Sequence, residues 1–180
     1  MSLSSEGPPN LVDFEKLVAE YGDRVYGIAL RVTGSPSDAE EVMQDAFLQA
    51  FRSWASFRGD ASRATWLYRI AVNAALMRVR SRQHEELLSD RDDDNALPDW
   101  TADALQAVLR GELRQQLEEG IARLPYELRI VLILRDVEGL STAETAAAFP
   151  KLSEAGVKSR LHRARVLLRR YLSERMARDE

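Results

Sequence analysis

The sequence predicts an all-α protein built from two small helical domains. Apolar residues recur at three- and four-residue steps over most of the chain, which is the period of a helix with one buried face. Helix-start signals precede several of these periodic segments. Residues 84–104 lack the period, are strongly acidic and contain Pro98. We therefore expect a flexible acidic linker there, joining a domain at 10–83 to a second at 105–178.

Composition limits the classes of protein that fit. A hydrophobic fraction of 45% in 180 residues is enough for a folded core. The chain has no cysteine, which excludes disulfides, thiol catalysis and cysteine-ligated zinc. Its first residues lack the basic and apolar regions of a signal peptide, and no apolar run approaches the ~18 residues of a membrane span. We expect a soluble, cytoplasmic protein without membrane insertion.

Charge is segregated along the chain, although the net charge is only −4. Residues 58–82 hold six arginines and one acid, for a local charge of +5. Residues 85–103 hold eight acids and one arginine, for −7, and residues 151–180 hold nine bases and four acids, for +5. Because a phosphate backbone responds to local charge, the two basic blocks are compatible with nucleic-acid binding.

The N-terminal domain begins with two predicted helices. Apolar residues follow the helical period from Leu11, and Gly34 is positioned to end this first helix. Ser35 then fits an N-cap with Pro36 at the first helical position, which predicts a second helix over roughly 36–54. One face of that helix is apolar, and the other is acidic and polar: Asp38, Glu40, Glu41, Gln44, Asp45 and Gln49. This second face is either an ordinary solvated surface or a docking surface for a basic partner.

A third helix is predicted over roughly 62–83, after a turn signalled by Gly59 and Asp60. Four apolar side chains at helical spacing are expected to complete a three-helix core: Trp66, Ile70, Ala74 and Met77. Asn73 and several arginines would lie off this apolar stripe.

Helical periodicity returns in the C-terminal domain from about Leu105. Pro125 separates a first helix from a second, because proline fits the first turn of a helix and not its interior. Gly139 is placed to end the second helix. The side chains expected to continue the core are Leu128, Val131, Leu132 and Val137.

A helix-turn-helix is predicted next. Ser141 and Glu144 have the spacing of a capping box, which opens a short helix over 142–149. Three alanines are expected to face inward from it: Ala143, Ala146 and Ala147. After a turn, Ser153 caps a final helix that runs from 154 to about 177.

The start of this final helix carries side chains that bind DNA in other helix-turn-helix proteins. Arginine can bond guanine through two hydrogen bonds, while lysine and serine bind phosphates or bases. The candidates follow the cap directly: Lys158, Ser159, Arg160, His162 and Arg163. The second, recognition helix of this motif lies in the major groove. The alternative is a basic, solvent-exposed face on a terminal amphipathic helix.

A second basic segment, residues 57–82, mixes arginines with Phe57, Trp66 and Tyr68. Cations bind phosphates and aromatic faces stack on unpaired bases, so the segment could hold a single strand of nucleic acid. Asn73 could bond the edge of an exposed base. The alternative is an amphipathic helix with a wet basic face and its aromatic residues in the core.

Four blocks of sequence resemble signature blocks of the extracytoplasmic-function (ECF) sigma factors, the smallest members of the bacterial sigma-70 type. They occur in the order and at the spacing of that family, and together they cover nearly all of residues 11–172. The blocks are DAEEVMQDAFLQAF (38–51), FRGDASRATWLYRIAVNAA (57–75), LPYELRIVLILRDVEGLSTAETA (124–146) and VKSRLHRARVLLR (157–169).

The resemblance implies that residues 10–83 form sigma region 2, which docks on core RNA polymerase and recognises and melts the −10 element. Docking on the β′ clamp helices is implied for Asp38, Glu41, Gln44, Asp45 and Gln49. Recognition of the −10 element, with capture of a flipped base by the loop 57–61, is implied for Phe57, Arg58, Gly59, Asp60, Asn73 and Arg78.

The resemblance further implies that residues 105–178 form region 4. This region would read the −35 element through the helix that carries Lys158 to Arg163 and pack on the β flap of the polymerase. Core polymerase, promoter DNA and an anti-sigma factor are the implied partners. The resemblance implies no cofactor, no metal ion and no catalytic residue. This chain departs from the family in its turn at 149–152, which is about one residue longer.

Three other functions fit the sequence less well than a sigma factor does. A stand-alone helix-turn-helix regulator would leave the segment 57–82 without a role. A sigma-like decoy that only binds an anti-sigma factor is expected to lose the basic residues of the final helix, and this chain keeps them. A helical enzyme is disfavoured because the sequence shows no metal-ligand spacing, no glycine-rich phosphate loop and no nucleophile–base pair.

Overall fold

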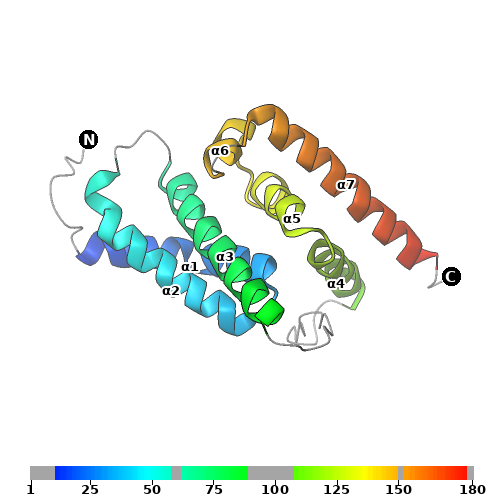
Figure 1. The fold of residues 1–180 in the computed structure, drawn as a ribbon, viewed down its shortest axis with the longest axis horizontal. Helices are drawn as coiled ribbons and strands as arrows, with labels where there is room; N and C mark the ends of the chain where they lie inside the picture. The colour runs from blue at the N-terminus through cyan, green and yellow to red at the C-terminus, as the bar shows by residue number, and fades with distance from the viewer. Residues whose placement is uncertain (1–10, 58–61, 89–107, 150–151, 178–180) are drawn as a thin grey trace.

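The fold is taken from a computed structural model, which describes residues 11–57, 62–88, 108–149 and 152–177. Every regular element in these ranges is a helix, which confirms the predicted all-α class. Figure 1 shows one group of helices formed by the first half of the chain and a second group formed by the other half. Within the described residues, no helix combines the length and apolar character that a membrane span requires.

The first group consists of α1 (Leu11–Thr33), α2 (Pro36–Ser53) and α3 (Arg63–Leu88), with a short 3-10 turn, η1 (Trp54–Ser56), after α2. The three α-helices pack against one another in all pairs. Their shared core contains fully buried aliphatic side chains and one aromatic: Val25, Ile28, Ala46, Leu67, Tyr68 and Val72.

The junction between α1 and α2 follows the predicted signals. Gly34 has a φ of 72°, the left-handed conformation that a glycine adopts without strain after a helix end. The side chain of Ser35 accepts a hydrogen bond from the backbone N–H of Asp38, and Pro36 occupies the first helical position. These predictions are confirmed.

Helix α3 departs from the prediction in length and in its buried face. It continues to Leu88, so residues 84–88 extend the helix into the segment expected to be linker. Met77 is 71% exposed, and Trp66 and Ala74 are only partly buried. The buried face instead centres on a set shifted around the helix: Leu67, Tyr68, Ile70, Ala71, Val72, Ala75, Leu76 and Val79. The reason is that α3 packs on both α1 and α2, which requires a wider buried face than one stripe.

The second group consists of α4 (Val108–Ala122), α5 (Tyr126–Leu132), a π-helical turn η2 (Ile133–Val137), α6 (Thr142–Ala147) and α7 (Glu154–Met176). Helix α7 packs on α4, α5 and α6 and covers this group along one side (Figure 1). Its buried residues Val157, Leu161 and Ala164 follow the predicted apolar period.

Three predicted core residues in this half are exposed: Val137, Ala143 and Ala147. Val137 is 45% exposed, because the wide π-helical turn changes the register and places Ile133 and Leu134 inward instead. In α6, Ala143 and Ala147 are exposed while Thr145 and Ala148 are buried. The capping box sets the phase of this helix, and the Thr145 hydroxyl donates to the carbonyl of Ser141 at 2.9 Å as it points inward.

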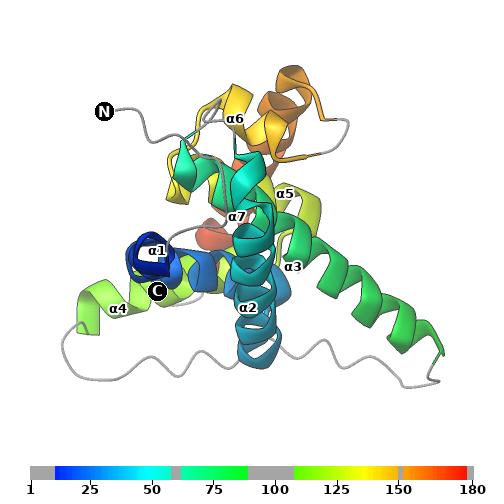
Figure 2. The same cartoon turned by 90° about the vertical axis from the view of Figure 1, so that its left-hand side faces the viewer.

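The two groups of helices touch each other. Helix α1 contacts both α4 and α5, and Figures 1 and 2 show α4 to α7 lying along one side of the first group. The sequence suggested two halves that need not meet in a fixed way. Specific contacts join them. Arg31 of α1 pairs with Glu118 of α4 at 2.7 Å, and Arg129 of α5 donates to the carbonyls of Arg31 and Val32 at the end of α1. The hydroxyl of Thr65, in α3, donates to Oε1 of Glu144, in α6, at 2.9 Å.

Candidate nucleic-acid interface

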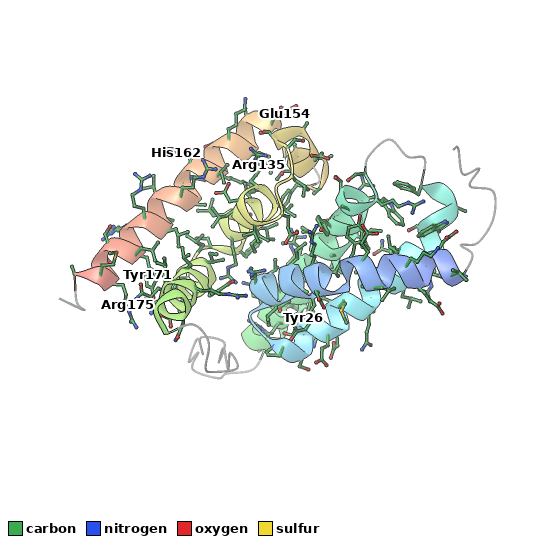
Figure 3. The ribbon with its side chains drawn as sticks, turned by 180° about the vertical axis from the view of Figure 1, so that it is seen from behind. Tyr26, Arg135, Glu154, His162, Tyr171 and Arg175 are labelled. Carbon is green, nitrogen blue, oxygen red and sulfur yellow. The ribbon has the colours of Figure 1, made fainter. Side chains whose placement is uncertain are left out.

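The N-terminal half of α7 presents a basic, solvent-exposed surface. The side chain of Ser153 accepts a hydrogen bond from the N–H of Gly156 at 3.1 Å and so caps the helix as predicted. Lys158, Ser159, His162 and Arg163 are exposed, while the apolar residues between them face the core. Figure 3 shows Glu154 at the start of α7 and His162 further along the same helix. Donors are therefore available where a recognition helix contacts base edges and phosphates.

Arg160 is placed differently from its four neighbours. Its guanidinium forms an ion pair with Glu127 of α5, with 3.4 Å between Nη2 and Oε2, and only 28% of the side chain is exposed. The pair ties α7 to α5. Arg160 is thus suited to hold the helix in position, and the exposed neighbours are the better candidates for direct contact with DNA.

A glycine lies in the first turn of α7. A Cβ atom added to Gly156 would lie 2.7 Å from Cδ1 of Leu152, closer than real contacts allow. The absence of a side chain at 156 lets Leu152 pack against the first turn of α7.

A bidentate ion pair joins α7 to the turn η2. Arg165 donates from Nε and Nη2 to the carboxylate of Asp136, at 2.9 and 2.7 Å. Hydrogen bonding to this carboxylate raises the pKa of Arg165. Sequence reasoning missed both this pair and Glu127, because neither acid is near α7 in the sequence.

The predicted docking face and the predicted −10 surface meet at an ion pair. Asp38 is 8% exposed. Its carboxylate accepts from Nε of Arg78 at 2.8 Å and pairs with Arg82 at 3.4 Å. Two residues expected to have separate functions thus bind each other and join α2 to α3.

The remainder of the predicted docking face is accessible. Glu41, Gln44, Asp45 and Gln49 are exposed along the outer side of α2. Glu41 also lies 3.1 Å from a guanidinium nitrogen of Arg78. Four of the five predicted docking residues therefore form one polar, acidic surface.

An aromatic cluster lies at the start of α3. Phe57 follows η1 and packs against Trp66 with ring centroids 5.0 Å apart. Trp66 in turn packs edge-on against Trp54, and the guanidinium of Arg63 lies 5.7 Å from the centre of the Trp54 ring. Sequence reasoning missed Trp54. The predicted site residues Arg58, Gly59 and Asp60 lie outside the described residues.

Asn73 is half-buried on α3, seven residues after Trp66. Seven residues are close to two helical turns, so the two side chains lie on the same side of α3, about 10 Å apart along its axis. Met77, one turn further, is 71% exposed. A stripe from the aromatic cluster to Met77 therefore runs along α3 through Asn73.

Among the residues that the structure describes, no group of three or more histidine, aspartate and glutamate side chains is placed to hold a metal ion.

Comparisons with known proteins match both halves of the chain. Residues 17–85 match the family model of sigma-70 region 2, and residues 114–168 match that of sigma-70 region 4. The ECF RNA polymerase sigma-E factor of Escherichia coli K12 is 37% identical over 159 residues, which cover 84% of this chain and 82% of that protein.

Two solved structures share the arrangement of helices. The sigma factor RpoE of Bartonella quintana, solved in complex with the anti-sigma factor NepR, has a TM-score of 0.72 at 23% identity, covering 89% of this chain and 97% of that one. CnrH, solved in complex with the cytosolic domain of CnrY, has a TM-score of 0.65 at 26% identity, covering 92% of this chain and 90% of that one.

Proposed function

This chain belongs to the extracytoplasmic-function sigma factors of the sigma-70 family, which direct RNA polymerase to promoters, and we propose that its exposed surfaces divide this task as follows. The exposed N-terminal half of α7 reads the −35 element, the stripe along α3 captures the −10 strand, and α2 holds the polymerase. The protein has no chemistry of its own. It works in the cytoplasm, where the polymerase and the promoter are.

Recognition of the −35 element is assigned to Lys158, Ser159, His162 and Arg163. Their exposure on a capped helix that is buried on its opposite side is the observation that carries this proposal. Arg160 supports them by fixing α7 on α5 through Glu127. Arginine and lysine supply both base contacts and the phosphate contacts that make binding salt-dependent.

Promoter melting is assigned to the stripe on α3. A base that leaves the duplex loses stacking worth a few kcal/mol, which the protein must replace. The aromatic cluster around Phe57 and Trp66 offers ring faces for stacking, and Asn73 offers an amide for the edge of a base. The loop 57–61 would close around the flipped base. Because Arg78 pairs with Asp38, we assign it to positioning α3 on α2.

Polymerase docking is assigned to the exposed acidic face of α2: Glu41, Gln44, Asp45 and Gln49. This face would meet the β′ clamp helices, while the C-terminal half packs on the β flap. Asp38 is left out of the contact surface because it is buried and paired within the domain.

An anti-sigma factor is the proposed regulator of this chain. The structure of RpoE includes the anti-sigma factor NepR, and that of CnrH, 26% identical to this chain, includes the cytosolic domain of CnrY. We infer that a regulatory protein chain binds this sigma factor also.

Run-off transcription with core polymerase on a promoter library tests the proposal. We expect specific starts that core polymerase alone does not produce. The double variant Lys158→Glu/Arg163→Glu should abolish them by reversing charge at the −35 surface. Arg170→Glu on the same helix is the matched control, since Arg170 is 76% exposed beyond that surface and pairs with Glu174. Absence of specific starts, or equal loss in the control, would refute the assignment.

A further inference from the structure

Two acidic side chains pair with arginines on the two edges of α7. On one edge, Arg165 donates from Nε and Nη2 to the carboxylate of Asp136 in the turn η2, at 2.9 and 2.7 Å. On the other edge, Nη2 of Arg160 lies 3.4 Å from Oε2 of Glu127, in the first turn of α5. At 3.6 residues per turn, the two arginines flank the buried stripe of α7 on opposite sides. The elements that support α7 therefore neutralise part of its positive charge.

Arg165 lies on the same edge of α7 as two residues that we assign to the −35 element. Lys158, His162 and Arg165 follow one another at steps of four and three residues, so they form one row along the helix. Arg165 is about 10 Å further along the helix axis than Lys158. Despite its ion pair, 55% of the Arg165 side chain is exposed. Arg165 is therefore placed where a cation could contact a phosphate, but two of its donors are bonded to Asp136.

A helix that lies in the major groove brings its edges close to the DNA backbone. The groove is about 12 Å wide, and a helix with its side chains is about 10–12 Å across. Cations at the edges of the helix therefore face phosphates. Phosphate contacts carry no sequence information, so they add affinity for DNA of any sequence. An unpaired cation at position 165 would accordingly strengthen binding to every sequence.

We propose that Asp136 withholds Arg165 from the DNA backbone and so limits the sequence-independent part of DNA binding by α7. This role presupposes that α7 binds DNA as proposed above. Lys158 and Arg163 differ from Arg165, because the structure gives neither of them an ion pair with any residue that it describes. Their charges are available to bases and phosphates, whereas the charge of Arg165 is neutralised by Asp136.

The salt dependence of binding to a random-sequence DNA duplex, measured by fluorescence anisotropy with the full chain, tests this role. The logarithm of the binding constant falls with the logarithm of the salt concentration, with a slope of about −0.9 for each phosphate contact. Asp136→Ala frees Arg165, so the slope should steepen by about 0.9, and binding should strengthen about five- to tenfold at roughly 0.1 M salt. A −35 duplex from a promoter selected by run-off transcription should show the same steepening, because the added contact is independent of sequence.

Three further variants separate the freed arginine from other effects. Asp136→Ala/Arg165→Ala removes the freed cation and should return the slope to that of the parent. Glu174→Ala is the matched control for net charge, because it frees Arg170, which is 76% exposed on the same helix beyond the −35 surface; it should leave the slope unchanged. Asp136→Asn removes the charge but keeps one acceptor, so it should steepen the slope by less. It also provides the test should circular dichroism show that Asp136→Ala is unfolded.

An unchanged slope for the folded Asp136 variants, or equal steepening by Glu174→Ala, overturns the proposed role of Asp136. Weaker binding of Asp136→Ala to the −35 duplex, without a steeper slope on random DNA, also overturns it, because that result is expected if Asp136 only positions α7. Failure of the proposed function gives a different result. A parent protein that prefers no sequence would refute the reading of the −35 element by α7, while a steeper slope for Asp136→Ala on random DNA would still support the role of Asp136.

Discussion

Replacing Arg129 with methionine should destabilise the fold by about 2–5 kcal/mol, because two opposing effects of this side chain do not cancel. Burial, with a smaller effect from the nearby charge of Arg82, lowers the pKa of Arg129 from its ordinary value to about 10. That lowering corresponds to roughly 3 kcal/mol of unfavourable free energy for the charged side chain. Neutral pH is below the pKa of Arg129 in both the unfolded and the folded state, so the whole of this cost is present there, and methionine removes it.

The hydrogen bonds of Arg129 act in the opposite direction. Its guanidinium donates to four backbone carbonyls at two helix ends: those of Arg31 and Val32 at the end of α1, and those of Ala122 and Leu124 at and just after the end of α4. A buried acceptor left without a partner costs about 1–3 kcal/mol. The lost hydrogen bonds to these carbonyls should therefore outweigh the removed cost of burying the charge. Lysine at position 129 should give an intermediate result, because a single ammonium keeps the charge but cannot span both helix ends.

Urea unfolding followed by far-ultraviolet circular dichroism measures this effect. The methionine variant should unfold at lower urea than the parent, with lysine between them. Equal or greater stability of the methionine variant would refute the view that Arg129 stabilises the fold through the helix ends.

Other substitutions test separate parts of the structure. Gly120→Ala should cost about 1–3 kcal/mol in thermal unfolding, because its Cβ would lie 2.6 Å from a leucine methyl of α7; unchanged stability would contradict this close packing. Ser141→Ala should cost about 1 kcal/mol by removing the cap of α6. Hydrogen bonds from Ser141 lower the pKa of Glu144 in the folded protein, so the ionised carboxylate stabilises the fold fully above pH 4.5, its ordinary pKa, and this stabilisation is lost as the pH falls through the lower pKa of the folded state. In Glu144→Gln the free energy of unfolding should therefore fall less steeply at acid pH, and an unchanged fall would contradict this. Asp38→Asn should lower the free energy of unfolding by about 1–2 kcal/mol, because it weakens the contacts of Asp38 with Arg78 and Arg82, while Asn at the exposed Asp45 should change it very little. If Asp38→Asn is as stable as the parent but binds the polymerase more weakly, Asp38 has the docking role instead.

Local signals were the part of the fold that could be predicted from sequence. Gly34, Ser35 and Pro36 end one helix and begin the next through bonds among neighbouring residues. The capping box of Ser141 and Glu144 is equally local. Because such signals are complete within four or five residues, they can be recognised without knowledge of the tertiary structure.

Contacts between distant segments could not be predicted. Asp38 and Arg78 are forty residues apart, and neither the ion pair nor the burial of Asp38 leaves a mark on the local pattern. Met77 fits the apolar period of α3 but is exposed, since the packing of three helices determines which face is buried. The contacts between the two groups of helices are likewise made by residues 79 to 98 positions apart.

The capture of a −10 base by α3 is tested most directly by promoter melting in the assembled polymerase complex. Permanganate reactivity of unpaired thymines should appear at the −10 element with the parent protein. Asn73→Ala should abolish it while the −35 footprint is kept, and Gln83→Ala, at an exposed position of α3 outside this stripe, should melt as the parent does. Equal melting by Asn73→Ala and the parent would contradict the role of α3 in holding the open strand.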